Sequence, residues 1–171
     1  MSELNKRRYE VQAILKSAVE AGLAATTEAA EAARWKVAEF GNAALVRADG
    51  IILMRFIGTR ERGWQWNRDG EEANTEEAHK IEEQRWQLHF IRKRTAGDGD
   101  DSYVVSDIAS NVQSWFNGRG CDFLRKYNMS NSRIDSERIL EYNDDSDLYQ
   151  KRVVFTLNIF VPKIITTTKG D

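Results

Sequence analysis

Residues 151–161 read KRVVFTLNIFV, and this stretch decides the fold. Its apolar side chains fall at every second position, which is the spacing of a β-strand with one buried face. The residues on that face are Val153, Phe155, Leu157, Ile159 and Val161. A strand of this kind needs paired neighbours and an apolar layer to cover it, so the rest of the chain must supply both.

Three further segments are predicted to be strands of the same sheet. Residues 83–94, EQRWQLHFIRKR, alternate in the same way as the last strand. Their apolar face consists of Trp86, Leu88 and Phe90. Residues 51–59, IILMRFIGT, are too apolar to have both faces in water, and a shorter strand is expected near 132–142.

Helical spacing of apolar residues predicts helices elsewhere. Residues 4–23 form the first predicted helix, which Gly22 is expected to end, and residues 26–41 form the second. A third helix begins at Ser106 and is followed by a short helical piece over 121–128. Residues 60–80 are polar and are predicted to be a loop.

This order of elements predicts an α+β fold. We expect a single domain with a mostly antiparallel sheet of about four to five strands flanked by helices. The domain organisation predicted is an N-terminal helical segment at 1–48, an α+β domain at 49–163 and a frayed C-terminal tail at 164–171.

Composition excludes several classes of protein. The chain has 171 residues and a formal net charge of −2, which argues against a non-specific grip on nucleic acid. No apolar run is long enough to span a membrane, and no secretory signal precedes the first predicted helix. Cys121 is the single cysteine, so we expect no internal disulfide and a reducing cytoplasm.

Residues that carry catalysis or bind metals do not form a motif. His79 and His89 are ten positions apart, one in a charged segment and one in a strand, so a zinc site is disfavoured. The aspartates that could suggest a calcium loop or a nuclease site are better interpreted as solvated turns; they are Asp98, Asp100, Asp101, Asp144, Asp145 and Asp147. We therefore expect no enzyme activity, no metal and no cofactor.

One polar segment combines cations with large aromatic residues, namely Arg60, Arg62, Trp64 and Trp66. Tryptophan and arginine are enriched at the centres of protein interfaces, so we predict that these four residues contact a partner. Two alternatives stay open: the tryptophans fold back onto their own core, or the segment stacks on single-stranded nucleic acid. The acids that follow directly, such as Glu71 and Glu72, oppose the nucleic-acid interpretation.

From about 49 to 163 the chain resembles the neck or tail terminator (tail completion) proteins of long-tailed bacteriophages. The segments that carry the resemblance are IILMRFIGTRERG at 51–63, EEQRWQLHFIRKR at 82–94, SDIASNVQSWFNGRGCDFLRKYN at 106–128 and the closing strand pair at 132–163. The first 48 residues depart from it, since they contain two apparent helices where the family often has one.

The resemblance implies a non-enzymatic virion protein found in the tail or neck, and in the host cytoplasm during assembly. Such proteins form homo-hexameric rings that cap the tail tube and join it to the neck. The partners implied are the tail tube protein, the neck or head-completion proteins and, in contractile tails, the sheath; DNA passes through without specific binding. The alternatives are a head-side neck adaptor, another phage structural part, or a small nucleic-acid-binding or nuclease-like protein.

The interface prediction is tested by Trp66→Ala. If Trp66 contacts a partner, the variant keeps its thermal stability but assembles poorly, because a large interface side chain has been removed. Thermal melting and imaging of the assembled particles measure the two effects separately. A large fall in melting temperature with assembly preserved would instead place Trp66 in the core.

Overall fold

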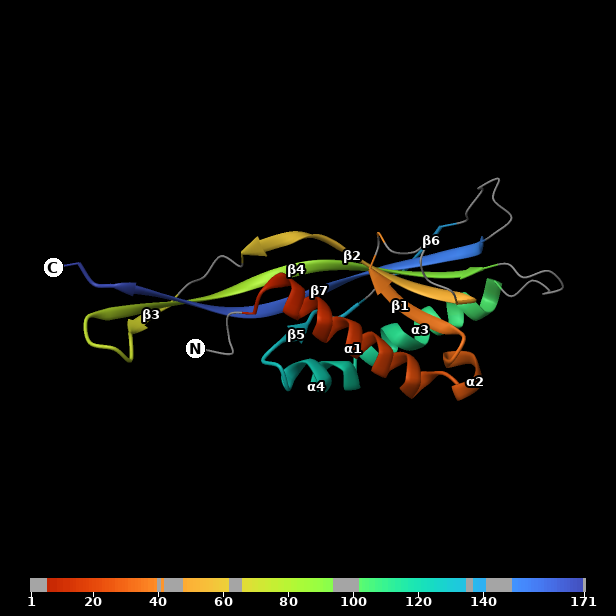
Figure 1. The fold of residues 1–171 in the computed structure, drawn as a ribbon, viewed down its shortest axis with the longest axis horizontal. Coiled ribbons are helices and arrows are strands. Elements are labelled where there is room, and N and C mark those ends of the chain that lie inside the picture. The colour runs from red at the N-terminus through yellow and green to blue at the C-terminus, as the bar shows by residue number, and fades with distance from the viewer. Residues whose placement is uncertain are drawn as a thin grey trace.

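Two strands run most of the length of the molecule. They are β4 (Thr75–Lys93) and β7 (Tyr149–Thr168), and they pair antiparallel from Thr75 opposite Thr168 to Lys93 opposite Tyr149 (Figure 1). The computed structural model describes residues 6–39, 41, 48–61, 66–93, 102–134, 137–140 and 149–170.

The other strands attach to this pair and complete one sheet of seven described strands. They are β1 (Trp35–Glu39), β2 (Gly50–Glu61), β3 (Trp66–Asp69), β5 (Ser130–Asn131) and β6 (Glu137–Leu140). Their order is β1-β2-β4-β7-β5, with β3 also on β4 and β6 also on β7. Only the β1–β2 pair is parallel, so the α+β fold with a mostly antiparallel sheet is confirmed, with more strands than expected.

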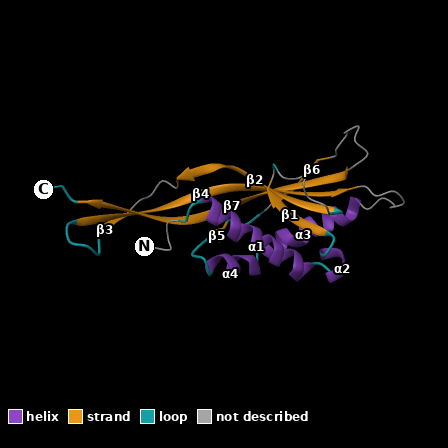
Figure 2. Cartoon of the chain, viewed as in Figure 1, coloured by secondary structure: helices purple, strands orange, loops and turns teal. Residues whose placement is uncertain are grey.

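Helices cover one side of the sheet (Figure 2). They are α1 (Arg8–Thr26), α2 (Ala29–Ala32), α3 (Ser102–Phe116) and α4 (Arg119–Arg125). Helices are confirmed near the predicted ranges 4–23, 106–116 and 121–128, but α3 begins four residues before Ser106, and α4 begins at Arg119 and ends at Arg125. Gly22 does not end the first one, because α1 continues through it to Thr26.

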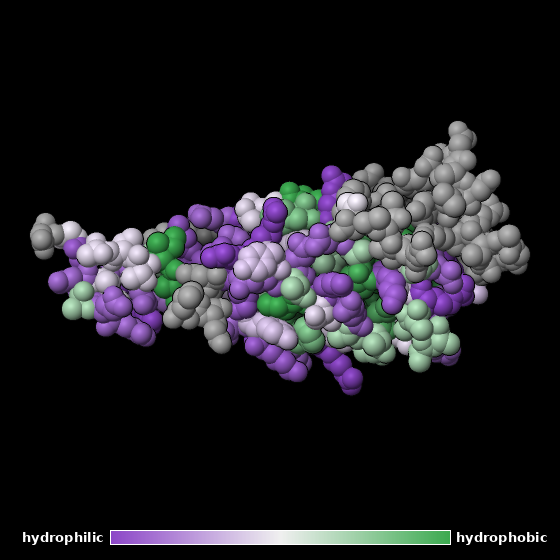
Figure 3. All heavy atoms as spheres, in the orientation of Figure 1, coloured by the Kyte–Doolittle hydropathy of each residue, from purple (hydrophilic) through white to green (hydrophobic). Residues whose placement is uncertain are grey.

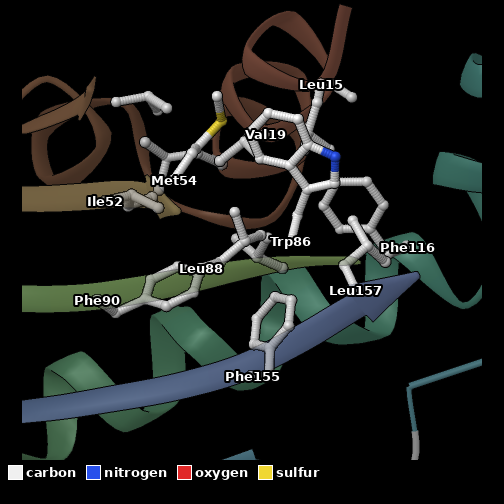
Figure 4. Packing of buried hydrophobic residues seen from close by; sticks show 14 of the residues in the cluster. Leu15, Val19, Ile52, Met54, Trp86, Leu88, Phe90, Phe116, Phe155 and Leu157 are labelled. Carbon is white, nitrogen blue, oxygen red and sulfur yellow. The ribbon is translucent and has the colours of Figure 1, made fainter. Parts of the chain in front are cut away.

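The core lies between the helices and the face of the sheet that the sequence pattern identifies. All five apolar side chains of the last predicted strand are at most 1% exposed. Beside them on β4 lie Trp86, Leu88 and Phe90, and the rings of Phe90 and Phe155 are 5.4 Å apart (Figure 4). From the helices Leu15, Val19 and Phe116 pack against this face (Figure 4).

β2 is buried on both faces along its first half. Ile52 and Met54 join the main core, while Ile51 and Leu53 form a smaller cluster on the other face with Ile91. This confirms that the segment is too apolar to face water on both sides.

The predicted second helix at 26–41 is wrong over most of its length. α2 has only four residues, and Trp35–Glu39 is a strand that pairs parallel with β2. Trp35 and Val37 alternate into the core, and the ring of Trp35 lies where a side chain at residue 50 would be, a place left open by Gly50. Burial of these two side chains outweighs the helix propensity of the alanine-rich segment.

The predicted loop at 60–80 and the predicted frayed tail at 164–171 are also corrected. β2 continues to Glu61, residues 66–69 form β3, and β4 begins at Thr75. β7 continues to Thr168 because β4 lies beside it and satisfies its backbone groups as far as Thr75. Pairing between long strands supplies these hydrogen bonds whether or not the side chains are apolar.

Trp115 fixes the crossing of three helices. Its indole ring fills the space beside Gly22 of α1 and Gly120 of α4: a Cβ added at either glycine would lie 2.8 Å from a ring carbon. The ring also contacts Phe116 and Phe123 edge-on or tilted. The glycines therefore allow close helix packing that any side chain would obstruct.

Gly22→Ala tests this packing. Alanine in a helix interior normally stabilises it by about 1 kcal/mol relative to glycine, but overpacking against the ring costs about 1–3 kcal/mol. We expect Gly22→Ala to lower the free energy of unfolding, measured in urea, when it is made in the natural chain. The same substitution should raise the free energy of unfolding when it is made in the Trp115→Ala variant, where the ring is absent. An equal effect in both backgrounds would show that the ring does not occupy this space.

Candidate protein-protein interface

The segment predicted to contact a partner lies along one edge of the sheet. Arg60 is near the end of β2 and is exposed, and Trp66 is the first residue of β3. Both strands pair with the same edge of β4, Arg60 opposite Glu83 and Trp66 opposite His79. Arg62 and Trp64 lie outside the described residues, as do the aspartates considered above.

Among the described strands, none covers the outer edge of β2 beyond its first half. β1 covers β2 only from Gly50 to Met54. From Phe56 to Glu61 the strand pairs with β4 on one side, and no strand of the described part of the chain pairs with it on the other. Unpaired edge strands can add a strand from another chain, so this edge is a candidate contact surface.

A bulge in β2 sets the direction of Arg60. The register with β4 shifts between Phe56 and Gly58, so that Ile57 is an extra residue and is 41% exposed. Before the bulge, the odd-numbered residues of β2 face away from the helices. After it the even-numbered residues do, since Arg60 pairs with Glu83 on that face.

Beside this edge the sheet has a hollow of about 450 Å³ on the face away from the helices. We call it the arginine hollow; it is lined by Ile57, Gly58, Thr59, Arg60, Glu83, Arg85 and Asn158. Arg60 and Arg85 are exposed cations without an ion pair to any described residue. Glu83 is the acid of the lining and is only 5% exposed. Together with Arg60 and Arg85 it gives the hollow one net positive charge.

The polar groups of the arginine hollow favour a carboxylate as the bound group. A guanidinium offers five N–H donors in a planar fork that matches a carboxylate or phosphate. Asn158 lies opposite Arg85 in the sheet register, and its Oδ1 atom is buried with no hydrogen-bond donor among the described residues. An acidic occupant would accept hydrogen bonds from the two exposed guanidinium groups.

Sequence reasoning missed Arg85 and Asn158, because they occupy polar positions of an alternating pattern, where such residues are expected. Each lies on the polar face of its strand, next to Trp86 and Leu157 respectively. Their proximity arises from the register between β4 and β7, which the separate segments do not contain.

β4 and β7 form a long two-stranded ribbon, and one end of it, which also carries β3, projects beyond the helices (Figure 1). Ion pairs stabilise this projecting end. Arg68 Nε donates to Glu77 Oε2 at 2.7 Å, and His79 Nε2 lies 3.2 Å from the same oxygen. Close to this group, Lys169, which directly follows β7, forms an ion pair with Asp69, the last residue of β3. Purple, hydrophilic residues are prominent on this end of the surface (Figure 3).

The remaining sequence candidates are not brought together. His89 is buried on β4 beside Gln87, and Cys121 lies in α4 with its Sγ 3.1 Å from the carbonyl of Phe116. Within the described ranges no group of three or more His, Cys, Asp or Glu residues is arranged to hold a metal ion. No helix in those ranges is long and apolar enough to cross a membrane.

No protein-family model matches the chain, and no curated protein matches its sequence.

The Arg68–Glu77 pair predicts a pH dependence of stability. The hydrogen bond from Arg68 holds the pKa of the Glu77 carboxyl below its ordinary value, against the opposing effect of desolvation. Stability from this group is therefore present above the unfolded-state pKa of about 4.3 and is lost as the pH falls through the lower folded value. In urea unfolding, we expect the advantage of the natural chain over Glu77→Gln to shrink below about pH 4. A difference that stays constant down to pH 2 would contradict the assignment.

Proposed function

We propose that this chain is a structural protein of a tailed bacteriophage, which caps the tail tube as a homo-hexameric ring and joins the tail to the neck. The resemblance of residues 49–163 to tail terminator proteins supports this function. The observation that carries it furthest is the open edge of β2 with the arginine hollow beside it, because this is a surface suited to a protein neighbour.

A ring places a physical demand on each subunit. Two different surface patches must match each other, and the rotation between neighbours must close. The open sheet edge is one such patch, and it contains Arg60, one of the four residues predicted to contact a partner. In the proposed ring the tail tube and the neck proteins bind its two faces, and the sheath is a further partner where the tail contracts.

The charge of the chain is compatible with a DNA conduit. A lumen that passes DNA without gripping it needs a neutral or acidic lining, and the chain has a formal net charge of −2. In this proposal the protein is part of the virion, assembles in the host cytoplasm and performs no catalysis.

A second candidate function is nucleic-acid binding, which the exposed Arg60 and Arg85 favour because guanidinium groups also bind phosphate. Glu83 within the hollow and Glu61 next to Arg60 weigh against it. Binding to single-stranded DNA separates the two functions: the second candidate predicts a complex with DNA, held through phosphates, that weakens steeply as salt rises.

Negative-stain imaging of the purified protein, alone and with tail tubes of the encoding phage, tests the proposal. We expect six-fold rings or caps at tube ends, because the tube aligns the subunits and adds to the contacts that they make with one another. Tubes mixed with an unrelated protein of similar size and charge are the control. Tube ends that stay bare at high protein concentration would contradict the function, and a mobility shift of single-stranded DNA would then favour the second candidate.

A further inference from the structure

We propose that the hairpin turn between β3 and β4 of one copy docks into the arginine hollow of the next copy. Residues 70–74 form this turn, and Glu71 and Glu72 are its docking side chains. The inference rests on the proposed function, since it names the surfaces through which two copies of the chain meet.

The turn is held in one shape by its own backbone. The amide of Gly70 donates to the carbonyl of Thr75 at 2.9 Å, and Thr75 donates to the carbonyl of Glu72 through its amide and its hydroxyl. Asn74 has a φ of 62°, and its carbonyl accepts from the amide of Lys169 at 2.6 Å. An ordered turn loses little conformational entropy when it binds, which favours its use as a docking element.

Glu71 and Glu72 are exposed acids at this end of the sheet. Both are exposed, and neither carboxylate has an ion pair or hydrogen bond within the described part of the chain. The neighbouring acids are engaged, Asp69 with Lys169 and Glu77 with Arg68. The turn lies at the projecting end of the ribbon, beyond the helices (Figure 1).

The arginine hollow offers complementary groups. Arg60 and Arg85 each provide a fork of donors that no acceptor in the described ranges engages, and charge-assisted pairs of this type are among the stronger hydrogen bonds. With Glu83 included, the hollow has one net positive charge. Its two guanidinium groups match the two carboxylates of the turn in number.

The turn cannot reach the hollow of its own chain. Thr75, which closes the turn, and Glu83, in the hollow, are eight positions apart on the same paired strand. At about 3.3 Å per residue this separation is about 26 Å, and the strand between them is held by β7. A contact between turn and hollow therefore joins two copies head to tail, which is the type of interface that closes rings.

Charge reversal tests the contact. One variant carries Arg60→Glu and Arg85→Glu, and the other carries Glu71→Arg and Glu72→Arg. Each variant alone opposes like charges at the contact, whereas an equimolar mixture restores opposite charges at every contact of an alternating ring. The matched control reverses two exposed cations on and next to α4, Arg119→Glu with Lys126→Glu.

Self-association is measured by sedimentation velocity over a range of concentrations at low salt. We expect each reversed variant to associate at least about tenfold more weakly than the natural chain, the mixture to recover, and the control to be unchanged. Association of the natural chain should also weaken between about 50 mM and about 500 mM salt. Circular dichroism confirms folding, and Arg60→Ala with Arg85→Ala replaces the first variant if it unfolds.

Three results would overturn the contact: association unaffected by either reversal, a mixture of folded variants that fails to recover, or a natural chain that is monomeric at every concentration and salt. Caps on tail tubes that form equally well with the reversed variants would keep the proposed function and overturn the contact. If self-association recovers in the mixture but no caps form on tail tubes, the result would support the contact and overturn the proposed function.

Discussion

The antiparallel pairing of β4 with β7 supports every other element of the sheet. β2 and β3 pair with the free edge of β4, β5 and β6 pair with the free edge of β7, and β1 attaches through β2. The same pairing fixes which residues face the helices, since a shift of one position would turn either Trp86 or Phe155 away from them. The large apolar side chains on both strands make such a shift costly.

This pairing extends beyond the helices, and the chemistry of the strands changes there. In the covered part the shared face consists of Val153, Phe155, Leu157 and similar residues. In the projecting part the strands contain threonines and charged residues, and ion pairs such as Arg68–Glu77 replace apolar packing. One long ribbon thus provides both the base of the core and an extension that carries an exposed acidic turn away from it.

Strands and helices with apolar periodicity were predictable from the sequence, and those formed by polar segments were not. The alternation in 83–94 and 151–161 correctly identified the buried face of the sheet. Residues 66–69, 75–82 and 164–168 lack this alternation, because their strand conformation depends on backbone pairing with a neighbour. Residues 35–39 have helix-forming neighbours, and their place beside β2 was decided by burial of Trp35.

For the candidate interface, the sequence by itself determined that Arg60 belongs to a segment rich in cations and tryptophans. Tertiary structure decided which residues accompany Arg60. The bulge at Ile57 turns Arg60 to the outer face, and the registers of β2 and β7 with β4 bring it to Arg85 and Asn158. The alternation of residues along one segment shows which side chains share a face of that strand. The register between two strands is set by the packing of the whole sheet, so it cannot be read from either segment alone.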